Sequence, residues 1–261
     1  MPKQLYTGFH AVEEKIRSVS ELKEKVSSME VFYAKPGPRV KKIIEEAKRA
    51  GIVCSPCASE TLDKMVQSLP LDAHARNHRG VVLQMEEDYS DNAVYFDGWI
   101  AKIDRSDDAR LTVVVLDSVT DPHNMGAILR SADQFGASLV IVPERRSVGD
   151  VRSNDVVARS SAGASAWVPV VAVKNLVRSV QLLKEAGFWI YGADSSGVPV
   201  QKLNFAAKTA LVMGSEGKGI SRLLADQCDA LVSIPTCGRI DSLNVSVAAG
   251  VLLYEIYRQR L

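Results

Sequence analysis

Three separated segments of the chain carry polar side chains of the kinds that bind ligands or take part in catalysis. The segments are residues 121–130, 211–217 and 234–246, and each joins an apolar run to a polar turn and then to a helical pattern. In an open parallel sheet, ligands bind where strands end and loops turn into helices. We therefore expect the three segments to form one pocket. The polar side chains that it would bring together are Asn124, Arg130, Glu216, Ser242 and Asn244.

The elements that must position these side chains are nearly continuous apolar runs rich in β-branched residues. Such runs are typical of strands buried on both faces, and hence of a parallel sheet covered by helices. Helical patterns lie between most of the runs. We therefore expect an α/β fold in the C-terminal part of the chain, with strands at residues 111–116, 139–142, 188–191, 210–213 and 230–234.

The expected last helix, at about residues 244–258, is apolar almost all round. A helix with no polar face at the end of a chain is either buried in the sheet or shared with a second subunit. The sequence leaves both alternatives open.

The N-terminal part, residues 1–85, has the shorter strands and amphipathic helices of a small α/β domain. Residues 86–108 carry 8 Asp/Glu against 2 Lys/Arg and are the best candidate for an acidic linker. Their apolar centre also allows a short helix or a docked segment. We therefore predict a small domain at 1–85, a linker at 86–108 and a larger α/β domain at 109–261.

Composition limits the classes of protein that are possible. The chain has 261 residues, 46% of them hydrophobic, but no apolar run reaches the roughly 18 residues that a membrane span needs. The first residues lack the apolar core of a secretory signal, and four cysteines make no disulfide framework, so we expect a cytoplasmic protein. Residues 1–85 carry 14 Lys/Arg against 10 Asp/Glu, which is compatible with contact to RNA.

Each candidate residue also has a simpler structural interpretation. Asn124, Ser242 or Asn244 at a helix start would act as a cap, worth about 1 kcal/mol. Glu216 would counter a helix dipole, and Arg130 would be a surface residue beside a buried stripe. These roles do not explain why three loops at one sheet edge carry the same mixture of side chains.

The order and spacing of the motifs explain why these loops share their polar side chains. The chain resembles the SpoU/TrmH family of RNA ribose 2'-O-methyltransferases, most closely the branch that acts on a guanosine of large-subunit ribosomal RNA. The resemblance runs from about Tyr6 to the C-terminus. It rests on Asn124-x-Gly126-x3-Arg130, Gly214-x-Glu216-Gly217 and Ser242-Leu-Asn-Val-Ser246.

The resemblance implies a fold, a cofactor and partners. The fold is a trefoil-knotted parallel-sheet (SPOUT) methyltransferase domain preceded by a small α/β, L30e-like domain that binds the RNA substrate. The cofactor is S-adenosyl-L-methionine, held by backbone groups at Gly214, Ile234 and Leu243. Members of the family are homodimers through the C-terminal domain, and no metal is expected.

The resemblance also implies roles for the polar residues. It makes Arg130 the general base, but a guanidinium group stays protonated at neutral pH, so we favour a grip on the phosphate beside the target ribose. Asn124 and Asn244 would position the Arg130 loop and the cofactor, with Glu216 bonded within the site. Ser242 is a candidate for a supporting role.

Some features leave alternatives open. Arg79 stands where members near this branch usually have glutamine, and Thr236 and Cys237 follow Pro235 where an apolar and a small residue are common. The substrate could instead be the ribose of a transfer RNA, or the chain could be a catalytically silent RNA-binding protein. A zinc site is a weaker alternative; its ligands would be Cys54, Cys57, His74 and His78.

Overall fold

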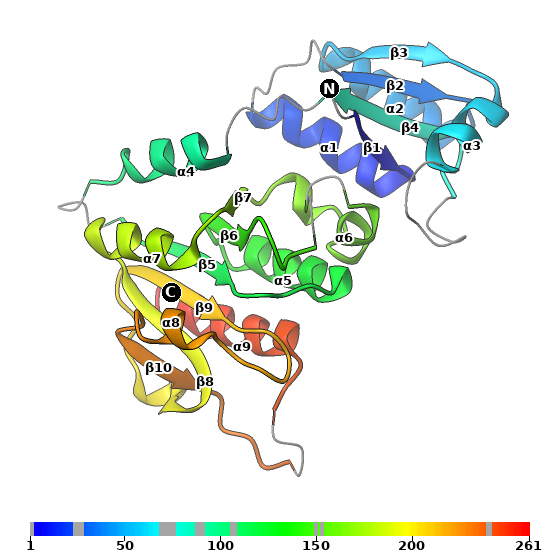
Figure 1. The fold of residues 1–261 in the computed structure, drawn as a ribbon. Helices are drawn as coiled ribbons and strands as arrows, with labels where there is room; N and C mark the ends of the chain where they lie inside the picture. The colour runs from blue at the N-terminus through cyan, green and yellow to red at the C-terminus, as the bar shows by residue number, and fades with distance from the viewer. Residues whose placement is uncertain are drawn as a thin grey trace. The chain divides into compact units, whose positions relative to one another are not determined.

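The computed structural model describes residues 3–22, 29–67, 77–86, 92–104, 109–148, 151, 154–238 and 242–261, and it divides into two compact units (Figure 1). Unit 1 comprises residues 1–89 and 150–167, and unit 2 comprises residues 90–149 and 168–261. A segment from the C-terminal half of the chain therefore packs with the N-terminal unit. The predicted domains at 1–85, 86–108 and 109–261 stay a prediction.

Unit 2 is built on a sheet of six parallel strands in the order β10-β8-β9-β5-β6-β7. Five of the six strands were predicted, and β7 was missed. The α/β class and the parallel sheet are thus confirmed. The strands are β5 (Leu111–Leu116), β6 (Leu139–Pro143), β7 (Val170–Val173), β8 (Trp189–Pro199), β9 (Lys208–Met213) and β10 (Ala230–Ser233).

The two central strands bring the first two motifs to the same edge of the sheet. β5 and β9 pair in parallel so that Leu116 lies opposite Met213. All six residues of β9 are buried. The chain therefore leaves the sheet at Asp117 and Gly214 side by side, and the backbone N–H of Asp117 still donates to the carbonyl of Met213 at 2.8 Å.

Helices cover both faces of this sheet (Figure 1). On one face α5 (Pro122–Gln134) packs against α9 (Val245–Arg258), and the ring of Phe135 lies 5.7 Å from that of Tyr254. The helices approach closely because Gly250 has no side chain; a Cβ there would lie 3.3 Å from the hydroxyl of Ser131.

The other face is covered by α4 (Asn92–Ile100), α7 (Leu176–Glu185) and the short α8 (Arg222–Ala225). Their side chains Phe96, Leu183 and Leu224 share one apolar core with the sheet. α4 lies in the segment predicted as an acidic linker, and Phe96 is only 3% exposed. The described part of that segment therefore docks on the sheet, which was the alternative interpretation of its apolar centre.

The last helix begins and ends close to where the sequence predicted. Its buried stripe, which includes Ala249 and Leu253, packs inside unit 2. A second apolar stripe faces solvent and gives the helix no polar face, as predicted. The exposed members of this stripe are Val247, Val251, Tyr254 and Tyr257.

Unit 1 has a four-stranded mixed sheet in the order β1-β4-β2-β3. Its helices α1 and α2 bury regular apolar faces, and Ala158 from the later segment joins their core. The unit therefore has a core of its own. Its elements are β1 (Lys3–Thr7), α1 (Phe9–Leu22), β2 (Met29–Tyr33), α2 (Pro38–Arg49), β3 (Val53–Pro56), α3 (Ser59–Gln67), β4 (Val81–Glu86) and α6 (Asp155–Ser160).

Specific polar contacts hold the later segment within unit 1. The indole N–H of Trp167 donates to Glu14 at 2.7 Å, and the hydroxyl of Thr7 donates to Asp155 at 3.3 Å. Burial raises the pKa of Asp155 to about 7, although Arg159 and the Thr7 hydrogen bond act to lower it. A substantial fraction of this carboxyl group is therefore uncharged at neutral pH.

The resemblance implies a knot, which segments spanning the second and third motifs would form. Residues 239–241 of that region lie outside the described residues, so the threading itself stays a prediction. No helix within the described ranges is long and apolar enough to cross a membrane.

Candidate active site at the carboxyl edge of the parallel sheet

Three side chains from the three predicted motifs form one hydrogen-bonded cluster. The amide nitrogen of Asn244 donates to Glu216 at 2.7 Å and to the side-chain oxygen of Asn124 at 2.9 Å. The amide nitrogen of Asn124 donates to the same Glu216 oxygen at 3.2 Å. Glu216 lies 92 positions and Asn244 lies 120 positions after Asn124 in the sequence. The fold therefore brings the three residues together.

Asn124 does not cap its helix, which corrects the simpler interpretation of this residue. α5 begins at Pro122, and the carboxylate of Asp121 is the cap, accepting from the backbone N–H of His123 at 3.0 Å. Asn124 therefore lies inside the first turn. Its side chain is free to serve the cluster, and the residue is only 8% exposed.

Asn244 has two roles at once. Its side-chain oxygen caps α9 by accepting from the backbone N–H of Ser246 at 2.9 Å and from that of Val247 at 3.4 Å. Its amide nitrogen makes the two bonds of the cluster. The predicted cap and the predicted positioning role are therefore compatible, because they use different atoms of one side chain.

The loop after β9 folds back over its own start. A Cβ on Gly214 would lie 2.0 Å from the backbone carbon of Gly219 and 2.2 Å from the nitrogen of Ile220, so only glycine fits there. Ser215 and Gly219 exchange backbone hydrogen bonds of 3.1 and 2.9 Å, which close the loop. Gly217, at its tip, has a φ of 81°, a conformation that favours glycine.

Asp117 anchors the far end of this loop and was missed by the sequence analysis. Its buried carboxylate accepts from the backbone N–H of Ser221 at 2.8 Å and from the hydroxyl of Ser118 at 3.1 Å. The only signal in the sequence was a carboxylate directly after a buried strand. Asp117 thus ties the end of β5 to the loop that follows β9.

Arg130 and Ser242 are not part of the cluster. Both are exposed, and neither makes a side-chain hydrogen bond or ion pair with another described residue. Arg130 lies on α5, two turns beyond Asn124, so its charge is available to a ligand. The structure therefore brings three of the five predicted polar residues together and leaves the other two facing solvent.

The predicted cofactor residues lie in the second and third loops. Ile234 directly follows β10, and Leu243 directly precedes the cap of α9; neither uses its backbone N–H or carbonyl in a hydrogen bond with another described residue. Free backbone groups of this kind can bind a polar ligand. Gly214, which opens the second loop, is partly buried.

The weaker zinc interpretation has no support within the described ranges. The thiol of Cys54 contacts the carbonyl of Ile52 at 3.6 Å, and that of Cys57 contacts the carbonyl of Tyr33 at 3.7 Å. Burial raises the pKa of both thiols, which disfavours the thiolate form that binds metals. His74 lies outside the described residues, and among the residues that are described no group of three or more metal-binding side chains occurs.

Comparisons with known proteins identify the family of the chain. The model of the SpoU rRNA Methylase family matches residues 111–254, which include all three motifs. The 23S rRNA (guanosine-2'-O-)-methyltransferase RlmB of Bordetella pertussis is 39% identical over 258 residues, covering 98% of this chain and 98% of the relative. A tRNA/rRNA methyltransferase of Borreliella burgdorferi, described as uncharacterized, is 37% identical over 236 residues, covering 88% of this chain and 98% of its own.

Solved structures show the same fold. The SpoU methyltransferase AviRb from Streptomyces viridochromogenes, in complex with the cofactor AdoMet, superposes with a TM-score of 0.75 at 25% identity, covering 99% of this chain and 90% of that chain. This chain belongs to the SpoU rRNA methylase family. The resemblance stated from the motifs is thereby confirmed.

The two roles of Asn244 can be separated by substitution. Asn244→Ser keeps an oxygen that can cap α9 but removes the amide donors, whereas Asn244→Ala removes both. We expect the alanine variant to be less stable than the serine variant by about 1 kcal/mol in urea unfolding, and methyl transfer to fall equally in both. Serine-variant activity close to wild type would show that the cluster does not serve the reaction.

Proposed function

We propose that this protein transfers a methyl group from S-adenosyl-L-methionine to the ribose 2'-hydroxyl of a guanosine in 23S ribosomal RNA. The observation that carries the proposal is the Asn124–Glu216–Asn244 cluster, which joins the three motif loops at one edge of the parallel sheet. The full-length similarity to an enzyme named for this reaction supports the choice of substrate.

The reaction needs a positioned hydroxyl and a dry pocket. S-adenosyl-L-methionine supplies an electrophilic methyl group on a positively charged sulfur. Holding the 2'-oxygen in line with that methyl group can contribute roughly 7–11 kcal/mol to catalysis. The protein's task is therefore mainly to fix two loops and the RNA backbone relative to one another.

The second and third loops fit the cofactor. Ile234 and Leu243 offer backbone donors and acceptors without partners among the described residues, which suits the edges of an adenine ring. Gly214 keeps the intervening loop folded close to β9. Glu216 would hold this loop to Asn124 and Asn244, so that the cradle and the first motif keep a fixed spacing. Ser242 precedes Leu243 in the sequence, so it would lie beside the bound cofactor.

Arg130 fits the phosphate next to the target ribose. It is exposed and has no counter-charge among the described residues, so binding an RNA phosphate would cost it no existing ion pair. A guanidinium group binds phosphate through two parallel hydrogen bonds, which would orient the neighbouring hydroxyl. Because a guanidinium group stays protonated, the hydroxyl proton would leave through the phosphate or water rather than to Arg130.

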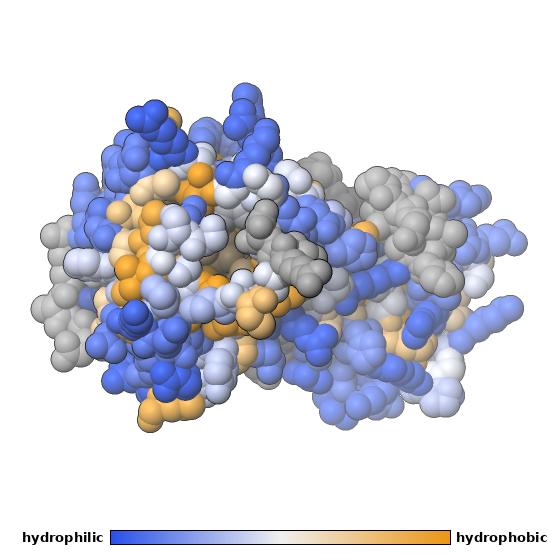
Figure 2. All heavy atoms as spheres, turned by 90° about the horizontal axis from the view of Figure 1, so that it is seen from below, coloured by the Kyte–Doolittle hydropathy of each residue, from blue (hydrophilic) through white to orange (hydrophobic). Residues whose placement is uncertain are grey.

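We propose that the protein acts as a homodimer through α9. The exposed stripe of Val247, Val251, Tyr254 and Tyr257 is continuous along the helix, and a solvent-facing apolar stripe of this kind is typical of a subunit interface. Figure 2 shows further apolar residues gathered on the surface of unit 2 in that view.

A cytoplasmic location is consistent with the proposed substrate. A ribosomal RNA substrate requires the protein to be where ribosomes are made. All four cysteines, Cys54, Cys57, Cys228 and Cys237, are free thiols, as is usual in a reducing compartment.

Substitution of Gly214 tests the cofactor cradle. Gly214→Ala forces its Cβ onto the backbone of Gly219 and Ile220, so the loop must move. We expect calorimetric affinity for S-adenosyl-L-methionine to fall at least about 10-fold, equal to about 1.4 kcal/mol. Gly98→Ala is the matched control, because a Cβ at that position meets no atom within 4 Å. Equal affinity in both variants, with both folded by circular dichroism, would remove Gly214 from the cradle.

Substitution of Arg130 tests the reaction itself. Wild-type protein should methylate transcribed 23S rRNA at a guanosine ribose, mapped by resistance of the 2'-O-methylated site to alkaline cleavage. We expect Arg130→Ala to lower turnover about 100-fold or more, equal to about 2.7 kcal/mol, with cofactor affinity little changed. Arg130→Lys should keep partial activity, because a point charge still meets the phosphate.

Two outcomes would count against this function. Methylation of transcribed transfer RNA in place of 23S rRNA would show that the substrate is transfer RNA. Full turnover by Arg130→Ala would show that Arg130 is a surface residue with no role in the reaction. A pH–rate profile of Arg130→Lys that shifts to a lysine-like pKa would instead support the general-base role.

The dimer prediction has a direct test. Sedimentation at micromolar concentration should give twice the chain mass of 28.4 kDa. Val251→Glu places a charge in the exposed stripe of α9 and should give a monomer. Val53→Glu, at a 61% exposed site on β3, is the control and should stay dimeric. A wild-type monomer would show that the stripe does not bind a second copy.

A further inference from the structure

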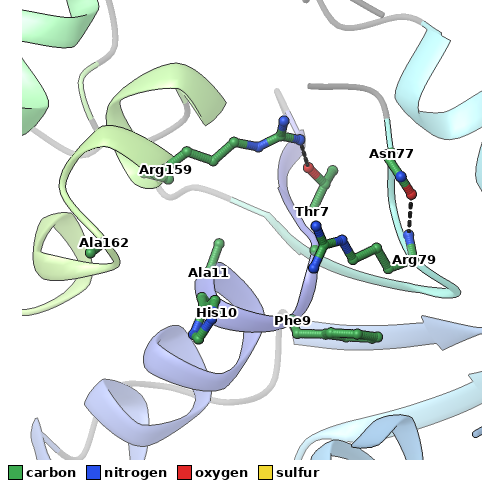
Figure 3. Close-up of a pocket in the computed structure, with 10 residues that line it drawn as sticks. Thr7, Phe9, His10, Ala11, Asn77, Arg79, Arg159 and Ala162 are labelled. Atoms are coloured by element: carbon green, nitrogen blue, oxygen red, sulfur yellow. Dashed lines mark hydrogen bonds between the residues drawn. The ribbon is translucent and has the colours of Figure 1, made fainter. Parts of the chain in front are cut away.

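Unit 1 contains a cavity of about 500 Å³ that the catalytic site does not use (Figure 3). Its walls come from the start of α1, the turn before β4 and the later segment around α6. Ala11 and Ala158 form part of its lining, and their side chains are too small to fill the space. The residues that matter here are Thr7, Phe9, Ala11, Asn77, Arg79 and Arg159.

Two guanidinium groups converge on this cavity. In Figure 3 the side chains of Arg79 and Arg159 both extend toward Thr7, and Arg159 donates to the Thr7 hydroxyl at 3.1 Å. Arg79 makes no ion pair with another described residue. Asp155 is buried, accepts the Thr7 hydroxyl and interacts electrostatically with Arg159, and it is not one of the residues that line the cavity.

The backbone at the cavity is held in conformations that side chains rarely adopt. Arg79 has a φ of 51° and Ala162, on the opposite wall, a φ of 53°. Each such residue costs of order 1–3 kcal/mol, and such residues cluster at functional sites. The side-chain oxygen of Asn77 accepts from the backbone N–H of Arg79 at 3.2 Å and so helps to hold this turn.

An aromatic ring supports the Arg79 guanidinium. Its central carbon lies 5.8 Å from the centroid of the Phe9 ring, within the range of a cation–π contact. A guanidinium plane fixed in this way offers its charge to a phosphate and its face to a base.

We propose that this cavity binds one unpaired nucleotide of the RNA substrate, with its phosphate between Arg79 and Arg159 and its base against the alanine-lined wall. The inference rests on the proposed RNA substrate. The volume lies within the about 300–1,000 Å³ typical of small-ligand sites. A paired base cannot enter such a space, because RNA bases become accessible to pockets only where they are unstacked. The site therefore selects a nucleotide of a loop or bulge.

The test compares RNA affinity in matched variants. Arg79→Gln keeps a polar side chain, although a shorter one, and removes the charge, and Arg49→Gln removes an exposed arginine of unit 1 at the end of α2. With a labelled 23S rRNA transcript, we expect Arg79→Gln to raise the Kd about 10-fold and to lower the salt slope by about 1. Arg79→Lys should keep most of the salt slope. Cofactor affinity and kcat at saturating RNA should not change, and Arg49→Gln should behave as wild type.

Several outcomes would overturn the proposal. They are an unchanged Kd and salt slope in Arg79→Gln, an equal loss in Arg49→Gln, or a loss confined to kcat. Binding of guanosine 5'-monophosphate is measured separately. If this nucleotide binds with a micromolar Kd that depends on Arg79, while the Kd for RNA does not change in Arg79→Gln, the cavity binds a free nucleotide instead. If the wild type binds the transcript but does not methylate it, the proposed function fails while the affinity comparison still decides the role of the cavity.

Discussion

The site depends on one shared oxygen atom of Glu216. It accepts hydrogen bonds from the amides of Asn124 and Asn244, and Asn244 also bonds to Asn124. These three contacts close a ring between loops that follow different strands. Both bonds to Glu216 are charge-assisted, a class that contributes more than bonds between neutral groups. The ring adds a polar connection between the starts of α5 and α9, two helices that also pack against each other through Phe135 and Tyr254.

The parallel sheet makes the ring possible. β5 and β9 are neighbours with Leu116 opposite Met213, so their loops begin at the same level. Asp117 then holds Ser221 at the far end of the second loop, and Gly214 lets the loop fold onto itself. The backbone groups of Ile234 and Leu243, at the same edge, have no hydrogen-bond partners among the residues that the structure describes. The strands thus fix where the loops begin, and the polar contacts fix how the loops fold.

Much of this arrangement could be predicted from the sequence because it depends on local patterns. The apolar runs gave five of the six strands, and the motif residues Asn124, Glu216 and Asn244 meet as expected. Local rules also account for the one incorrect role. An aspartate followed by proline is a strong signal for a helix start, so Asp121 and not Asn124 should have been assigned as the cap.

Other features were beyond a single sequence because they arise from contacts between distant residues. Asp117 bonds to a residue 104 positions away, and Thr7 to one 152 positions away. The sequence around each residue does not identify its distant partner. The cavity in unit 1 has the same origin, because its lining includes both Thr7 and Arg159. Its arginine, Arg79, was visible only as a departure from the family pattern.

The assignment of residues 150–167 to unit 1 has a consequence for how the chain can be divided. The polypeptide passes between the two units three times, so no single cut yields two complete halves. Removing the first 85 residues would strip the covering from Ala158 and leave Trp167 without its acceptor, Glu14. The parallel-sheet half is therefore not a detachable module, and any attempt to transplant it must carry along or redesign the excursion between β6 and β7.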